Sequence, residues 1–197
     1  MLDFLHQLFS FVCGQSLAHT WSPGGEVLPC CQRCTGLYVG AFTAALLHLA
    51  RAPQPTRFWR WLNGSFLLLM IPAGYHWFPQ SAAVRAASGI LFGFGLVAYL
   101  WLPLLEKFTI YDLRFTSAGH ERRVNRKSQI ANALVLLTAL VGTPLLGESE
   151  TPLAAAVLTL LTAGGALALA MLLAANVWFA ARGLWQWLFR PAQRVAT

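Results

Sequence analysis

Charged residues are scarce in this chain of 197 residues. Only 11% of the residues are Asp, Glu, Lys or Arg and 57% are hydrophobic, whereas a soluble domain carries about 25% charged residues. So little charge argues against a soluble enzyme, and so much apolar character excludes a disordered chain. The composition therefore predicts a protein whose solvent is a lipid bilayer.

Several functional motifs are also lacking. The sequence contains no glycine-rich phosphate-binding loop, no paired carboxylates within an apolar stretch and no helical histidine pair of the haem-binding kind. These absences argue against nucleotide-driven and proton-pumping functions. No internal repeat is visible, which argues against an inverted-repeat transporter.

Acidic residues are the scarcer of the two charges. The chain has 7 Asp and Glu against 14 Lys and Arg, which gives a net charge of +7. A basic excess is typical of nucleic-acid binding, but the basic cytoplasmic loops of membrane proteins produce the same excess. Because the basic residues gather in such loops, we expect no nucleic-acid partner.

Five stretches contain no Asp, Glu, Lys or Arg and approach the roughly 20 residues that a membrane-spanning helix needs. They are residues 34–50, 61–84, 86–105, 128–147 and 151–181. The sequence therefore predicts an all-α polytopic membrane helix bundle of about five transmembrane helices. We divide it into an outer-facing amphipathic segment with a cysteine motif (1–33), the transmembrane domain (34–181) and a cytoplasmic interfacial tail (182–197).

The first residues predict a short helix that lies in the membrane interface. Leu2, Leu5, Phe9 and Val12 recur at helical spacing, and the polar residues fall mostly on the other side. The segment lacks the basic start of a signal peptide, so we expect it to remain in the mature protein.

The basic residues predict the orientation. Twelve of the 14 lie between the first and second spans, between the third and fourth, or after the fifth. By the positive-inside rule these loops face the cytoplasm, so the N-terminus lies outside and the C-terminus inside. We expect a multi-pass protein of the inner (plasma) membrane. Only Arg33 and Arg85 fall on the outer side.

All four cysteines, Cys13, Cys30, Cys31 and Cys34, lie on the predicted outer side. Cys31 and Cys34 form a Cys-x-x-Cys motif at the start of a predicted helix, where the helix dipole and the free N–H groups lower a thiol pKa. Cys13 lies 18 positions before Cys31, far enough to fold back as a third thiol.

Three interpretations of the cysteines stay open. Disulfides would persist in an oxidising compartment and would pin the N-terminal segment to the first span. Alternatively, the Cys-x-x-Cys motif is a redox pair with Cys13 or Cys30 as relay, and a membrane quinone is its simplest electron acceptor. In the third interpretation, thiolates and a histidine hold a zinc, copper or iron ion. The candidate ligands are Cys13, Cys31, Cys34, His19 and His76.

Arg33 and Arg85 are the second candidate feature. Small residues four apart follow each of them, in GLYVG (36–40) and GILFG (89–93), and this spacing allows two helices to approach closely. If the first and third spans pack through these faces, both arginines and Cys34 meet in one outer crevice. Such a crevice suits an anionic headgroup, a carboxylate or a quinone oxygen.

His76 lies near the outer end of the second span. It can act there as a proton carrier or a ligand that faces the crevice. The alternative is that Tyr75, His76 and Trp77 form an aromatic belt at the membrane surface.

The stretch CGQSLAHTWSPGGEVLPCCQRCTGLYVG (13–40) resembles the signature of an uncharacterised family of prokaryotic integral membrane proteins, domain of unknown function 2085. That signature runs Cys-His-Gln, then Arg-Ser, then Cys-x-Arg-Cys-Thr-Gly-Ile-Tyr-x-Gly. VRAASGILFGFG (84–95) resembles a second block of the family. The matching residues are Cys13, Gln15, Cys31, Arg33, Cys34, Thr35, Gly36, Tyr38, Gly40, Arg85, Gly89 and Gly93.

This sequence departs from the family pattern at several positions. Gly14 replaces the histidine after the first cysteine, and His19 replaces the arginine before the serine. The acidic residue and the glutamine expected near the end of the second span are missing around residues 73–77. The resemblance supplies no reaction, but it singles out the residues of the predicted crevice.

The leading functional hypothesis is thiol chemistry, either redox or metal binding, in this outer-facing crevice. Cys13, Cys31 and Cys34 would be the reacting thiols, and the ligand-binding residues would be Arg33, Arg85, Tyr38 and His76. The alternative is a non-enzymatic accessory subunit or lipid-binding scaffold of a membrane complex, with structural disulfides and with other membrane subunits and lipid as partners. The sequence leaves open whether the protein is an enzyme.

Overall fold

The computed structural model describes residues 2–51, 56–112 and 118–188, and within these ranges every regular element is a helix. The elements are α1 (Leu2–Ser10), the 3-10 helices η1 (Leu17–His19) and η2 (Pro23–Gly25), α2 (Gln32–Arg51), α3 (Arg57–Gly74), α4 (Ala82–Asp112), α5 (Ala118–Gly147) and α6 (Pro152–Leu188). The predicted all-α class is confirmed.

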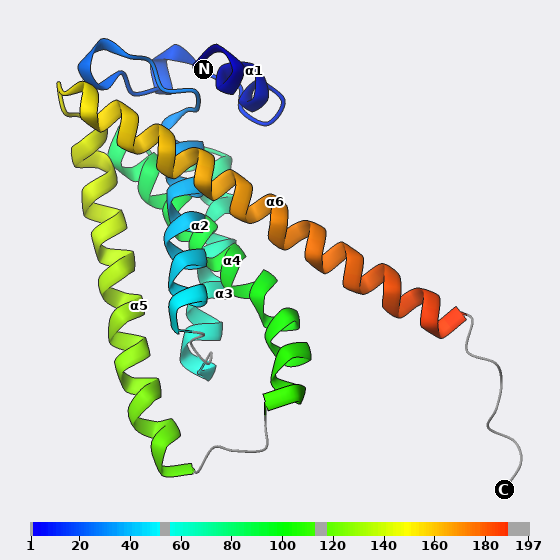
Figure 1. Ribbon diagram of the computed structural model, residues 1–197. Helices are drawn as coiled ribbons and strands as arrows, with labels where there is room; N and C mark the ends of the chain where they lie inside the picture. Colours follow the sequence, from blue (N-terminus) through cyan, green and yellow to red (C-terminus); the bar gives the residue numbers. More distant parts are fainter. Residues whose placement is uncertain (1, 52–55, 113–117, 189–197) are drawn as a thin grey trace, which may run out of the picture.

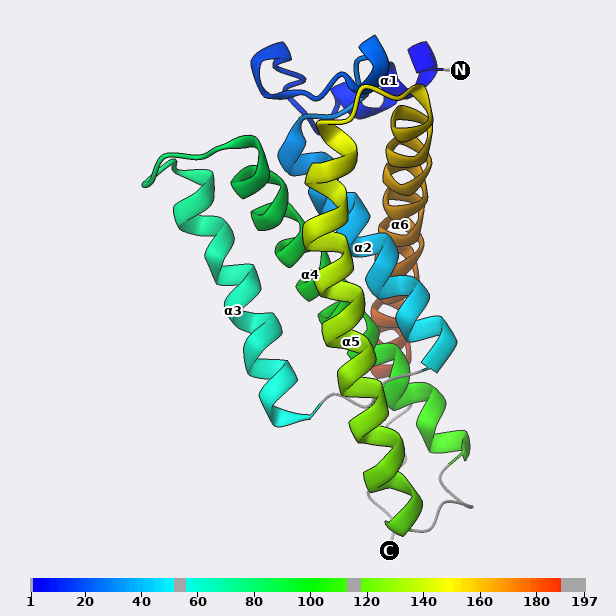
Figure 2. The same ribbon diagram turned by 90° about the vertical axis from the view of Figure 1, so that its left-hand side faces the viewer.

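The five long helices form a bundle with α2 at its centre (Figures 1 and 2). α2 packs against α4, α5 and α6, whereas α3 packs mainly on α4. The N-terminal segment, the α3–α4 connection and the α5–α6 connection lie at the same end of the bundle (Figure 2). The core lies between α2, α4, α5 and α6. Its buried side chains include Ala44, Ile90, Phe94, Val97, Leu136, Leu169 and Leu172.

Two glycine-containing faces bring α2 and α4 into backbone contact. A Cβ atom on Gly36 would overlap the backbone of Ala86, and one on Gly89 would overlap the carbonyl oxygen of Arg33. The contacting positions rise together along both helices, so the helices run parallel. The predicted packing of the first and third spans through their small residues is therefore confirmed.

Glycines also let α6 approach the centre of the bundle. A Cβ atom on Gly165 would overlap the carbonyl oxygen of Tyr38 on α2. Farther along α6, the Nδ2 atom of Asn176 donates to the carbonyl oxygen of Leu100 on α4 at 2.9 Å. α6 is thereby docked against two neighbours.

The second predicted span ends too late. α3 ends at Gly74 rather than at residue 84, and α4 begins at Ala82 rather than at residue 86. The predicted span was limited only by charged residues, and the α3–α4 connection contains no Asp, Glu, Lys or Arg. The end of α3 is stabilised instead by side chains, because Arg33 and Gln80 both donate to the carbonyl oxygen of Ala73.

At the opposite end, helices extend beyond the predicted limits. α5 begins at Ala118, inside the predicted basic loop, and α6 continues to Leu188, through the start of the predicted tail at residue 182. Basic and aromatic residues mark depth in a membrane, but they do not end a helix. Residues 113–117 of that loop and residues 189–197 of that tail lie outside the described residues.

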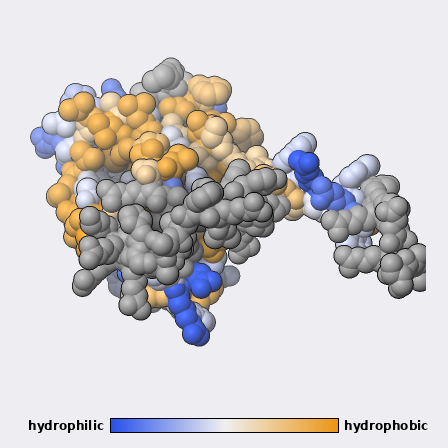
Figure 3. Space-filling model, turned by 60° about the horizontal axis from the view of Figure 1, so that its bottom comes forward, coloured by the Kyte–Doolittle hydropathy of each residue, from blue (hydrophilic) through white to orange (hydrophobic). Residues whose placement is uncertain are grey.

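Within the described residues, three helical segments are long and apolar enough to cross a membrane: Ala82–Leu104 of α4, Gln129–Gly147 of α5, and Pro152–Leu188 of α6. On the face seen in Figure 3, hydrophobic side chains cover a large part of the surface that is not grey. The exposed hydrophobic residues of the bundle include Leu134, Leu137, Val141 and Leu145 on α5 and Leu160, Leu167 and Met171 on α6. So extensive an apolar surface is typical of contact with lipid.

Candidate functional site: a cluster of three thiols

The N-terminal segment folds back over the start of α2. Its backbone is left-handed at Gln15, with a φ of 43°, a conformation that is uncommon outside glycine. The Gln15 Nε2 atom donates to the carbonyl oxygen of His6 at 2.7 Å and to that of Pro29 at 2.9 Å. These bonds tie the middle of α1 to the residues just before α2, which places Cys13 beside Cys31.

Trp21 anchors the same segment to the last two helices. Its side chain is only 5% exposed and packs with Ala155 and Leu158 of α6. Its ring lies against Gly147, and the backbone of Gly24 lies against Pro152. The sequence signal for this anchor was a single tryptophan within a polar stretch.

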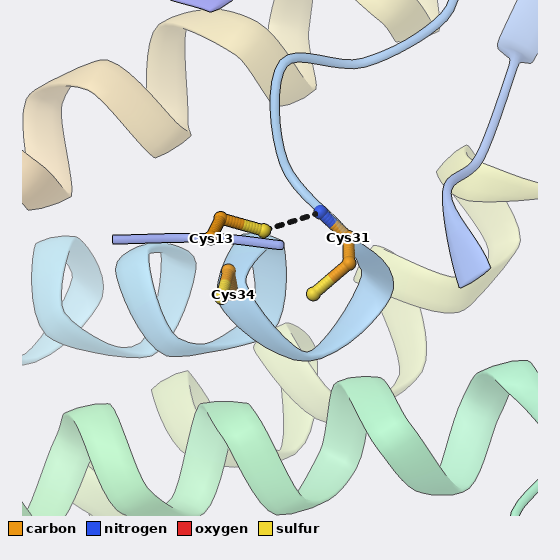
Figure 4. A group of neighbouring side chains, drawn as sticks. All are labelled: Cys13, Cys31 and Cys34. Carbon is orange, nitrogen blue, oxygen red and sulfur yellow. Dashed lines mark hydrogen bonds between the residues drawn. The ribbon is translucent and has the colours of Figure 1, made fainter. Parts of the chain in front are cut away.

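Three sulfur atoms meet beneath this segment. The Sγ atoms of Cys13, Cys31 and Cys34 all lie within 4.8 Å of one another. The backbone N–H of Cys31 donates to the Cys13 Sγ at 3.3 Å (Figure 4). Cys13 is buried and the other two are half-buried. Cys13 thus joins the Cys-x-x-Cys motif as a third thiol, as its position in the sequence allowed.

None of the four cysteines forms a disulfide, and all four lie within the described residues. The predicted disulfide is therefore wrong for this structure. Sequence spacing showed which thiols are able to meet, but it carried no information on whether two sulfurs lie at bonding distance. Cys30, which is fully buried, packs beside Cys13 and Phe9 but stands outside the group of three.

The start of α2 favours a thiolate at Cys31. The Cys34 thiol donates a hydrogen bond to the Cys31 sulfur, and the backbone N–H groups of Cys34 and Arg33 add to it. Together they lower the pKa of Cys31 from 9.0 to about 5. Burial acts in the opposite direction on Cys30 and raises the pKa of that thiol. Cys31 is therefore the thiol that ionises first.

Tyr38 lies one turn along α2 from Cys34 and packs against the cluster. Its ring centroid is 5.2 Å from that of Phe9, which closes the cluster from the α1 side.

The two predicted histidine ligands lie elsewhere. His19 is the last residue of η1, and its ring nitrogens do not belong to the group of ligand atoms that lie within 4.8 Å of one another. His76 is exposed in the α3–α4 connection. The rings of its two neighbours in the sequence, Tyr75 and Trp77, stack on each other. Among the described residues, the group of candidate ligand atoms is therefore made of sulfurs alone.

The two arginines belong to a different group of contacts. Arg33 donates through Nη2 to the carbonyl oxygen of Ala73 at 2.8 Å and to the Oε1 atom of Gln80. Arg85 donates through Nη1 to the Oε1 atom of Gln32 at 3.2 Å. The thiols and the arginines thus have different partners: the cysteines pack with the N-terminal segment, whereas Arg33 contacts the end of α3 and Gln80, and Arg85 contacts Gln32. That they share one crevice stays a prediction.

Gln32 and Gln80 were missed by the sequence reasoning. The resemblance called for a glutamine near residues 73–77, and Gln80 lies just beyond that stretch, where it contacts Arg33. Gln32 lies inside the Cys-x-x-Cys motif, next to Arg33, and its side chain is 6% exposed. The sequence signal was its position between Cys31 and Arg33.

An apolar helical bundle that holds free thiols at one end defines a helical membrane protein with a cysteine site. A family model described as "Predicted membrane protein (DUF2085)" matches residues 13–99. The chain is also 34% identical, over 100 residues, to an uncharacterised protein of Methanothermobacter thermautotrophicus; the alignment covers 50% of this chain and 87% of that protein. The chain therefore belongs to the DUF2085 family of predicted membrane proteins. No solved structure matches it.

Proposed function

We propose that the protein binds one soft metal ion through the thiolates of Cys13, Cys31 and Cys34. The observation that carries this proposal is the approach of three free sulfur atoms to within 4.8 Å of one another. Metal–sulfur bonds of about 2.3 Å in a tetrahedral site separate the sulfurs by roughly 3.8 Å. A small inward movement would therefore gather the three around one ion.

The surroundings of the sulfurs suit zinc or copper(I). Thiolates are the ligands that select these ions among the metals of the cell. The N–H groups at the start of α2 offset part of the negative charge that thiolates bring to the site. Because Cys13 reaches the site only when the N-terminal segment is folded back, we expect metal binding to stabilise that segment.

Metal analysis of the full chain tests the proposal. The detergent-purified protein is loaded with zinc(II), or with copper(I) under anaerobic conditions, and desalted before elemental analysis. One ion per chain is expected. Each of the variants Cys13→Ser, Cys31→Ser and Cys34→Ser is expected to lose most of it. Cobalt(II) in place of zinc adds a thiolate charge-transfer absorption that reports sulfur ligation directly.

Cys30→Ser is the matched control, because Cys30 is a neighbouring thiol that stands outside the group of three. This variant is expected to keep the ion. A wild-type chain that retains neither zinc nor copper(I) would refute the proposal.

The Cys-x-x-Cys geometry supports a second function, a redox pair. Cys31 and Cys34 lie in one helical turn, and the thiol of Cys34 donates to the sulfur of Cys31. On oxidation the two sulfurs form one S–S bond and release two protons and two electrons, which a membrane quinone takes up to become a quinol. In metal-free protein, treatment with a quinone should therefore lower the number of thiols that react with an alkylating reagent by two. Thiols that stay alkylatable after quinone treatment would exclude this function.

We further propose that all five helices α2–α6 span the inner membrane, with the N-terminus outside and the C-terminus in the cytoplasm. α2 is not among the described helices that are apolar enough to cross a membrane by length and composition alone, but its polar residues Gln32, Thr35 and His48 are buried and do not face lipid. In this arrangement α1 lies at the outer surface, with Phe9 directed into the thiol cluster and Phe4 exposed.

A further inference from the structure

Arg85 lies where two helices begin. It belongs to the first turn of α4, and its guanidinium group reaches across to Gln32, the first residue of α2. The Gln32 side chain is buried, and Arg85 is itself half-buried. A cation is thus held against the first turns of two parallel helices.

This position is electrostatically unfavourable for a cation alone. The unpaired N–H groups at a helix N-terminus carry partial positive charge, which favours anions and disfavours cations. Neither α2 nor α4 has an acidic residue in its first turn. Within the described residues, the partners of both guanidinium groups are uncharged oxygens.

Arg33, which follows Gln32 in the sequence, is a second cation in the first turn of α2. Its contacts with the end of α3 have a structural explanation, because a cation is favoured at a helix C-terminus. Arg85 has no such explanation. In both residues the Nε atom is buried without a hydrogen-bond partner, so each guanidinium group keeps an unpaired donor, although a buried polar group is normally hydrogen-bonded.

We propose that Arg85, together with Arg33, binds the phosphate group of an anionic ligand at the ends of α2 and α4. Guanidinium groups and helix N-termini are the two protein groups best suited to phosphate. Exposed Tyr75 and Trp77 lie in the α3–α4 connection at the same end of the bundle, and such rings favour the depth of lipid headgroups. The phosphate is that of a lipid headgroup or a free ion.

This site is separate from the thiol cluster. Cys13, Cys31 and Cys34 face the N-terminal segment, whereas Arg85 faces α2 from the α4 side. The metal content of an Arg85 variant therefore reports on the thiol site alone, and the two proposals succeed or fail independently.

Thermal unfolding of the full chain in maltoside micelles and phosphate-free buffer tests the proposal. Phosphatidylglycerol, phosphatidylcholine and inorganic phosphate are added in separate titrations. The unfolding midpoint of the wild type is expected to rise with phosphatidylglycerol or with inorganic phosphate. A rise with phosphatidylglycerol alone identifies a lipid headgroup, and a rise with inorganic phosphate alone identifies a soluble anion.

Arg85→Gln is expected to abolish the rise. The matched control is Arg57→Gln, which removes an exposed arginine from the first turn of α3 at the other end of the bundle and should leave the rise unchanged. If Arg85→Gln does not fold, Arg85→Lys takes its place. Lysine retains the charge but cannot donate two parallel hydrogen bonds to one phosphate, so roughly tenfold more lipid or phosphate should be needed for the same rise in the unfolding midpoint. The proposal is overturned if neither phosphatidylglycerol nor inorganic phosphate raises the wild-type midpoint, or if the tested Arg85 variant responds like the wild type.

Discussion

Gln15 decides, at the scale of single residues, whether Cys13 reaches the start of α2. Its left-handed backbone reverses the chain, and its amide group holds two carbonyl oxygens that are far apart in the sequence. No other described side chain makes both of these contacts. The third thiol of the site therefore depends on a residue that carries no chemistry of its own.

We predict that Gln15→Ala loosens the segment between α1 and α2. Two hydrogen bonds of about 1 kcal/mol each are lost, so amide hydrogen exchange in residues 13–31 should speed up roughly tenfold or more. Exchange followed by mass spectrometry measures this. Gln7→Ala removes an exposed glutamine from α1 and should leave the exchange unchanged. Equal exchange in both variants would show that the Gln15 amide does not hold the segment.

Cys31 is the residue whose reactivity should depend on pH in the mildly acidic range. Donation from the Cys34 thiol and from the nearby N–H groups lowers its pKa to about 5. In metal-free protein, alkylation of Cys31 by iodoacetamide should therefore rise with a midpoint near pH 5. Cys34→Ala removes the largest of these donors and should move the midpoint upward. Alkylation of each cysteine is followed by peptide mass spectrometry.

The same ionisation affects stability. Because the folded-state pKa lies below the ordinary value of 9.0, the thiolate of Cys31 stabilises the fold fully above pH 9, and this contribution fades as the pH falls to about 5. Cys30 serves as the internal comparison, since burial raises its pKa and should leave it unreactive. A Cys31 midpoint at the ordinary thiol value would contradict the hydrogen-bonding account.

At the scale of helices, the contact between α2 and α4 is the feature on which the arginine site depends. It places the first turns of two parallel helices side by side, so Arg85 reaches Gln32 while the cysteines keep the other face of α2. Only residues without a Cβ atom allow the backbones to approach this closely.

We predict that Gly89→Ala weakens this contact. The added methyl group would overlap the carbonyl oxygen of Arg33, and relief requires a movement of backbone, which costs about 1–3 kcal/mol. The thermal midpoint should fall by roughly 2–10 °C. Gly142→Ala on α5 is the matched control, since a Cβ atom there meets nothing within 4 Å. If both variants unfold at the same temperature, the helices do not require the glycine.

At the scale of the whole molecule, the connections between the helices separate the chain into two ends. The cysteines, the arginine pair and the α5–α6 connection lie at one end, and the first turn of α3 with Arg57 and Arg60 lies at the other. If the five long helices cross the membrane, these ends face opposite compartments.

Cysteine labelling in intact cells tests this orientation. Glu150→Cys, in the α5–α6 connection, should gain label from a membrane-impermeant thiol reagent above the wild-type level. Arg57→Cys should gain label only after the cells are permeabilised. Both positions are exposed, so accessibility of the compartment decides the result. The opposite pattern would reverse the orientation, and labelling of both without permeabilisation would contradict the five-span arrangement.

Much of this architecture could be predicted from local patterns. Uncharged stretches located the five long helices, and small residues four apart predicted that α2 meets α4, because both patterns act through neighbouring residues on one helix. The end of α3 could not be predicted, because it depends on Arg33 and Gln80, which donate to Ala73 from separate elements.

The sequence by itself determined that this is an apolar helical protein and that Cys31 and Cys34 share a helical turn, since composition and spacing are properties of the chain. Only the tertiary structure decided that Cys13 joins them as a free thiol, that the histidines do not, and that Arg33 and Arg85 donate to Ala73, Gln80 and Gln32. These outcomes depend on which face of α2 each neighbouring element covers. That choice is made by packing and by a few hydrogen bonds between residues distant in the sequence.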